Sequence, residues 1–130
     1  SAEIYKEFIM PIHKKAAGEL QKYGPVILHT CGNVADRLPY IASTGFKIFH
    51  MDSKNNIAEA VKTVGNRMLI TGCINNPVLL AQGEPQDVKR AVEENIKSGI
   101  KLISPECAIP FSVSSDNLIA LVEAAHNTKL

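Results

Sequence analysis

The chain has 130 residues, the length of one ordinary domain, and 45% of them are hydrophobic while 21% are charged. A formal net charge of +1 argues against a nucleic-acid partner, and no apolar run approaches the length of a membrane span. Three cysteines are too few and too odd in number for a disulfide scaffold, so we expect a cytoplasmic protein with free or metal-bound thiols.

Helices and short apolar strands alternate along the whole sequence. Residues 2–22 have the apolar spacing of a helix, and Pro11 predicts a kink or two abutting segments there. Strands are expected at 25–30, 46–51, 67–72 and 100–104. Further helices are expected at 34–44, 57–65, 84–99 and 115–127.

This alternation predicts an α/β fold of four parallel βα units, because short strands separated by helices pair through right-handed crossovers. Four such units fit either a small open sheet or half of a TIM-type (β/α)8 barrel, whose whole length is about 250 residues. A half barrel leaves two open strand edges that need a partner. The chain begins with Ser1, so it could be a piece of a longer polypeptide.

Polar and sulfur-containing residues follow every expected strand. They lie at the carboxyl ends of parallel strands, where α/β sheets and barrels place their sites. In chain order they are His29, Cys31, Asn33, His50, Asp52, Cys73, Asn75, Asn76, Glu106 and Cys107.

Within this set, His29 and Cys31 are expected to point to one place, since residues two apart in an extended segment share a face. Cys107, after the fourth strand, is the natural third ligand for a zinc ion with one open coordination position. A single cysteine or histidine at such a position is more often a packing or hydrogen-bonding residue. The combination of three favours a metal site.

The segments "HTCGN" and "SPECAIP" resemble the His-x-Cys…Cys zinc motif of the methylcobamide:coenzyme M methyltransferases, in the uroporphyrinogen decarboxylase superfamily. The resemblance covers nearly the whole chain and corresponds to the carboxy-terminal half of that family's barrel. It implies that residues 1–130 form a single half-barrel domain. It also implies that His29, Cys31 and Cys107 are the zinc ligands.

By this resemblance the reaction transfers a methyl group from a methylated corrinoid protein to a small thiol such as coenzyme M. The thiol binds zinc, loses its proton and attacks the methyl carbon, so zinc is the cofactor and the methylcorrinoid a co-substrate. A corrinoid protein and a small thiol are the implied partners. The open edges would be closed by a missing amino-terminal half or by a second copy.

Roles for the neighbouring residues are less specified. Asp52 matches an acidic position of the family and is a candidate catalytic residue, a weak ligand or a structural cap. Asn33 and Asn75 are candidate cofactor-site residues. Each of these three residues could also orient His29. Cys73 departs from the family pattern and is either a fourth ligand or an inert buried thiol. Glu106 replaces a glycine and adds a carboxylate beside Cys107; its role is open, and one alternative is that it only faces solvent.

Other readings stay open from the sequence. Cobalamin-independent methionine synthase also uses a His-x-Cys…Cys zinc site, and an O-demethylating corrinoid methyltransferase or a uroporphyrinogen decarboxylase-like enzyme would share the fold. A non-catalytic zinc-binding fragment or assembly module is the alternative outside the enzymes.

Overall fold

The computed structural model describes residues 1–128. Its four strands form one parallel sheet in the order β1-β2-β3-β4, so each strand pairs with its neighbour in the chain. The sequential parallel order confirms the predicted α/β fold of four βα units. The strands are β1 (Ile27–Thr30), β2 (Ile48–Met51), β3 (Leu69–Ile74) and β4 (Ser104–Pro105).

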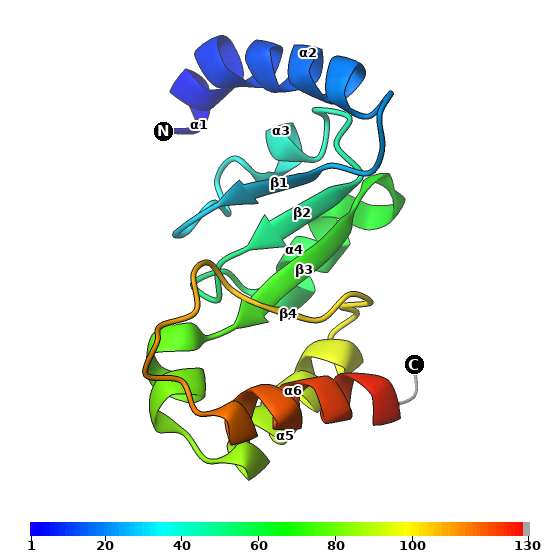
Figure 1. Cartoon of the computed structure of the whole chain (residues 1–130). Helices are drawn as coiled ribbons and strands as arrows, with labels where there is room; N and C mark the ends of the chain where they lie inside the picture. The colour runs from blue at the N-terminus through cyan, green and yellow to red at the C-terminus, as the bar shows by residue number, and fades with distance from the viewer. Residues whose placement is uncertain (129–130) are drawn as a thin grey trace.

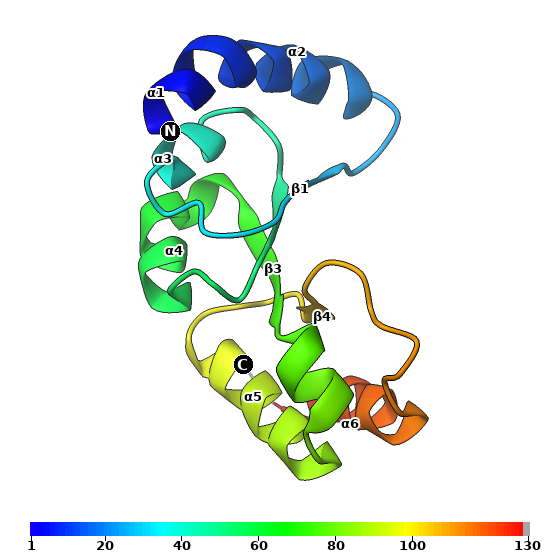
Figure 2. The same ribbon diagram turned by 90° about the vertical axis from the view of Figure 1, so that its left-hand side faces the viewer.

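The helices lie at the ends and on one face of this sheet. Figure 1 shows α1 and α2 beyond β1 at one end, and α5 and α6 together beside β4 at the other. Figure 2 views the strands nearly edge-on, with α3 and α4 on one face of β1 to β3 and no described helix on the opposite face. The helices are α1 (Ala2–Ile4), π-helical η1 (Tyr5–Ile9), α2 (Met10–Leu20), α3 (Leu38–Ile41), α4 (Ile57–Val64), 3-10 helix η2 (Gly65–Arg67), π-helical η3 (Asn76–Leu80), α5 (Pro85–Lys97) and α6 (Ser115–Asn127).

The interruption expected at Pro11 is present. Pro11 lies in the first turn of α2, and the π-helical segment η1 leads directly into that turn, so the regular α-helical hydrogen-bond pattern is interrupted where the ring has no N–H to donate. None of the helices in residues 1–128 is long and apolar enough to cross a membrane.

Two predicted elements are much shorter than expected. The helix predicted over 34–44 contains only α3, because Pro39 belongs in a first helical turn and Asn33 holds the chain before it in a turn by accepting from the Ala35 amide at 3.0 Å. Of the strand predicted over 100–104, only Ser104 lies in a strand, as the first residue of β4. A cleft of about 540 Å³ lies at the amino ends of β2 and β3, where residues 99–101 do not pair with β3.

Buried side chains form two clusters, one on each side of β3. In the first, Phe49 and Met51 of β2 are fully buried and pack with Ile41 of α3 and Val64 of α4. The second lies between α5 and α6, and on α5 it contains Val88, Val92 and Ile96, which form one apolar stripe of that helix. Side chains alternate along a strand, so His50 lies on the opposite, uncovered face of β2.

Close approach between β2 and β3 requires a glycine at position 72. Gly72 pairs with Met51 in the ladder, and its φ of 92° is one that residues with a side chain rarely adopt. A Cβ atom at this position would lie 2.3 Å from the Met51 carbonyl oxygen.

We therefore predict that Gly72→Ala lowers the free energy of unfolding by about 2 kcal/mol or more, measured by urea denaturation followed by circular dichroism. Gly18→Ala is the matched control, because Gly18 is exposed within α2 and a Cβ there meets nothing within 4 Å. That variant should be stabilised by about 0.5–1 kcal/mol. Equal stability of the two variants would contradict the account.

Candidate metal centre

Three potential metal ligands from opposite edges of the sheet meet at one point. His29 lies on β1, Cys31 follows it, and Cys107 follows β4. His29 Nε2 is 3.1 Å from Cys31 Sγ, which is 3.3 Å from Cys107 Sγ, and the three atoms lie within 4.8 Å of one another. The structure thus brings together the three residues that the sequence analysis selected as ligands.

The donor set suits zinc. Two thiols and one imidazole are ligands that Zn²⁺ prefers, and all three side chains are exposed, which leaves room for a fourth ligand from solvent. Tetrahedral bonds of about 2.3 Å would place two sulfurs about 3.8 Å apart. The observed sulfur–sulfur distance of 3.3 Å needs only a small outward shift to reach this value.

The two thiols also share a hydrogen bond. The hydrogen bond between the two thiols is the main cause that lowers the pKa of Cys107, and it is also the main cause that raises the pKa of Cys31. The pair therefore loses its first proton more easily than its second. Metal binding requires both protons to leave, so the affinity should increase with pH.

Asp52, at the carboxyl end of β2, holds the loop that carries Cys31. Its carboxylate accepts from the amides of Gly32 at 2.8 Å and Lys54 at 2.9 Å. Burial acts to raise the pKa of Asp52, but these two amide bonds outweigh it and the pKa lies below its ordinary value. Asp52 lies outside the group of three ligand atoms. Among the three roles considered for it, catalytic residue, weak metal ligand and structural residue, this geometry favours the structural one.

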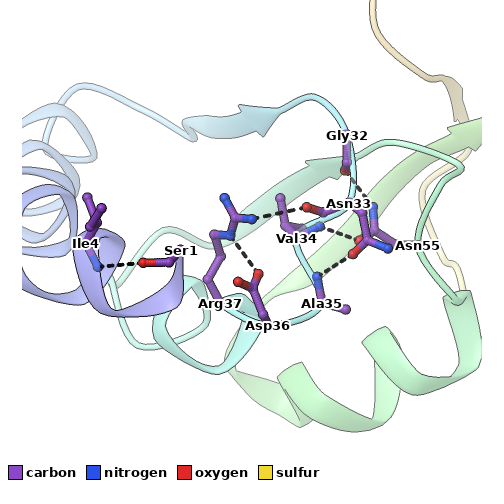
Figure 3. Close-up of polar contacts among 9 residues, drawn as sticks. All are labelled: Ser1, Ile4, Gly32, Asn33, Val34, Ala35, Asp36, Arg37 and Asn55. Carbon is purple, nitrogen blue, oxygen red and sulfur yellow. Dashed lines mark hydrogen bonds and ion pairs between the residues drawn. The ribbon is translucent and has the colours of Figure 1, made fainter.

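The same loop is fixed a second time by Asn55. Its side chain donates to the Gly32 carbonyl at 3.0 Å and accepts from the Val34 amide at 2.8 Å (Figure 3). Gly32 has a φ of 79°, so the chain turns sharply directly after Cys31. Together these contacts set the direction in which Cys31 leaves the sheet.

Of the alternatives left open for Glu106, the one in which it only faces solvent is wrong. Its side chain is only 6% exposed, and its carboxylate accepts from the Ser53 amide at 2.6 Å, the Asn75 side chain at 3.0 Å and the Asn76 amide at 3.3 Å. These donors come from the loops after β2 and β3, so Glu106 fixes the strand end that carries Cys107. A buried carboxylate persists only with such partners.

Neither predicted asparagine orients His29. Asn75 caps η3 by accepting from the amides of Val78 and Leu79, while Asn33 holds its own turn. The Nδ1 atom of His29 instead contacts His50, at 2.7 Å from its ring Nδ1 and 3.1 Å from its carbonyl oxygen. The sequence analysis placed His50 among the strand-end residues but assigned it no role, although it occupies the position on β2 that pairs with His29.

Cys73 behaves as a buried packing residue. It is 7% exposed and lies outside the group of three ligand atoms. Burial, followed by the charges of Glu106 and Asp52, raises the pKa of Cys73 to about 12. Its burial and its position outside the ligand group support the inert interpretation.

The structure predicts that Asp52→Ala releases the loop that carries Cys31. Losing two hydrogen bonds to a charged acceptor should lower the free energy of unfolding by about 2 kcal/mol or more and speed hydrogen exchange of the Gly32 amide. The control is Asp36→Ala, because Asp36 forms an exposed pair with Arg37, and this change should cost less than about 0.5 kcal/mol. Unchanged exchange at Gly32 would show that Asp52 does not hold the loop.

Comparison with known proteins places this chain in a family. The chain is 32% identical over 130 residues to the methylated-thiol–coenzyme M methyltransferase of Methanosarcina mazei, covering 100% of itself and 35% of that protein. It is 31% identical over 128 residues to the methylcobamide:CoM methyltransferase MtbA of Methanosarcina acetivorans, covering 98% of itself and 38% of that protein. The chain therefore spans little more than a third of the length of these relatives.

A solved structure described as a methyltransferase from Methanosarcina mazei superposes with a TM-score of 0.91 at 26% identity, over 97% of this chain and 37% of that one. With its four parallel units, the chain has the fold of half a TIM-type barrel. The family model for uroporphyrinogen decarboxylase (URO-D) matches residues 1–128. This chain belongs to the uroporphyrinogen decarboxylase family.

Proposed function

We propose that the polypeptide containing this chain transfers a methyl group from a methylated corrinoid protein to a small thiol of the coenzyme M type. The observation that carries the proposal is the convergence of His29, Cys31 and Cys107 at the carboxyl ends of parallel strands. Relatives at about 30% identity are named coenzyme M methyltransferases, which supports the same reaction class.

The chemistry explains why a thiol acceptor needs such a site. A free alkyl thiol has a pKa near 8.5, so at neutral pH most of it is protonated and a poor nucleophile. A zinc ion held by His29, Cys31 and Cys107 would supply the Lewis acidity that keeps the substrate sulfur deprotonated. That sulfur then attacks the methyl carbon, a carbon–sulfur bond forms, and the electrons of the carbon–cobalt bond stay with cobalt.

The residues of this chain contribute binding and orientation. The exposed faces of the three donors leave the approach open to a thiol and to a large corrinoid-bearing partner. Asp52 and Glu106 hold the two loops that carry the cysteines, and the protonated Cys73 does not compete for the metal. Asn33 and Asn75, the candidate cofactor-site residues, hold the chain that follows β1 and β3 through their bonds to backbone amides.

The proposal includes the domain arrangement. Residues 1–130 would form the carboxy-terminal half-barrel of a longer fold, completed by an amino-terminal half or by a second copy of the chain. Residues that recognise the rest of the thiol substrate would come from that other half. Two exposed thiols at the site suit a reducing compartment, which we propose to be the cytoplasm.

We predict that the purified chain binds one Zn²⁺ per molecule. Cys107→Ser should lower the zinc affinity about 100-fold or more, measured by competition with a chromophoric chelator, because a hydroxyl is a far weaker zinc ligand than a thiolate. Cys73→Ser is the matched control and should leave the affinity within about threefold. Equal loss in both variants would contradict the assigned ligand set.

We also predict methyl transfer from methylcobalamin to coenzyme M by the complete polypeptide that the source cell makes. Activity should disappear with Cys107→Ser and persist with Cys73→Ser. Zinc binding without methyl transfer, in a folded complete polypeptide, would refute the enzyme proposal and favour a non-catalytic zinc module.

A further inference from the structure

His50 lies between the two parts of the metal site. Its Nδ1 is 2.7 Å from His29 Nδ1, and its Nε2 is 2.8 Å from the carbonyl oxygen of Pro105. His29 belongs to β1, whereas Pro105 belongs to β4, two residues before Cys107. One side chain on β2 therefore connects the strand that carries one ligand with the strand that leads to another.

The hydrogen-bond partners determine the proton positions in this chain of contacts. The Pro105 carbonyl can only accept, so His50 Nε2 carries the proton and donates to it. In a neutral imidazole the other nitrogen is then an acceptor, so His50 Nδ1 accepts from His29 Nδ1–H. His29 Nε2 is left with a free lone pair, and this is the atom that faces Cys31 Sγ at 3.1 Å.

We propose that His50 is a positioning residue that fixes His29 in the Nδ1–H tautomer and presents its Nε2 to the metal. The inference deepens the proposed metal site and rests on it for its purpose. Ligating histidines generally donate their second ring nitrogen to a fixed acceptor, and loss of that acceptor typically costs 10–100-fold in metal affinity. Here the acceptor is a second imidazole, itself anchored to the strand that leads to Cys107.

The fold favours this contact in two ways. His29 and His50 are paired in the parallel register, and their rings meet edge to face with centroids 4.6 Å apart. The two acidic residues near the site do not compete for His29, because the carboxylates of Asp52 and Glu106 are engaged with loop amides. The His50 carbonyl also lies 3.1 Å from His29 Nδ1, and it would remain after any substitution at position 50.

The first test reads the tautomers in the metal-free protein. Long-range ¹H–¹⁵N NMR of the whole chain labelled at histidine should show His29 with its proton on Nδ1 and His50 with its proton on Nε2. An Nε2–H tautomer at His29 would overturn the proposal without any variant. Because no metal is present, this result does not depend on whether the chain binds zinc.

The second test uses two substitutions at position 50. His50→Phe keeps a ring but can neither accept nor donate, so His29 should lose its tautomer preference and Zn²⁺ affinity should fall 10–100-fold in the chelator assay. His50→Gln offers an amide oxygen and an N–H group, and should restore the affinity to within about threefold of wild type. His126→Phe, at an exposed position on α6, is the control and should change neither quantity.

Unchanged tautomer and affinity in His50→Phe would overturn the proposal, since the carbonyl of residue 50 would then suffice. If His50→Phe does not fold, the wild-type spectrum decides the question through the ¹⁵N–¹⁵N coupling that an N–H···N hydrogen bond transmits between His29 Nδ1 and His50 Nδ1. Absence of that coupling would overturn the proposal, because the carbonyl of residue 50 would then be the only acceptor. A chain with His29 in the Nδ1–H form that binds no zinc would refute the metal site alone.

Discussion

The site depends on buried carboxylates that tie the strand-end loops to one another. Asp52, after β2, holds the amide of Gly32 in the loop after β1, and Glu106, after β4, holds the amide of Ser53 in the loop after β2. Because Asp52 and Ser53 are neighbours, the loop after β2 joins both contacts. Each carboxylate accepts hydrogen bonds from N–H donors, which offset the free-energy cost of its burial. If the loops moved away, the carboxylate would be buried without partners and the fold would be destabilised.

This arrangement explains how ligands from β1 and β4 meet across a sheet of four strands. The loop after β2 fixes Cys31 through Asp52, and Glu106 fixes the end of β4 that leads to Cys107. On the uncovered face, His50 adds a contact from His29 to Pro105. The ligand geometry is therefore a property of the strand-end loops, and the helices beneath the sheet supply the hydrophobic support.

Much of this was predictable from local patterns. The alternation of helices and apolar segments predicted the parallel strands, and the two-residue spacing of His29 and Cys31 predicted that their side chains share one face. Contacts between strands were not predictable in the same way: the burial of Glu106 and the pairing of His29 with His50 depend on register and on loop positions. The strand expected at 100–104 failed for a similar reason, since apolar composition alone does not show which residues of a segment pair with β3, and only Ser104 and Pro105 do so.

The most direct measurement of the central claim is zinc X-ray absorption on the metal-loaded chain. The account predicts a first shell with two sulfurs at about 2.3 Å, one imidazole nitrogen and one light exchangeable ligand, and a third sulfur when coenzyme M is added. Three sulfurs before any thiol is added, or a single sulfur at any stage, would contradict the convergence of one histidine and two cysteines on a metal with an open position.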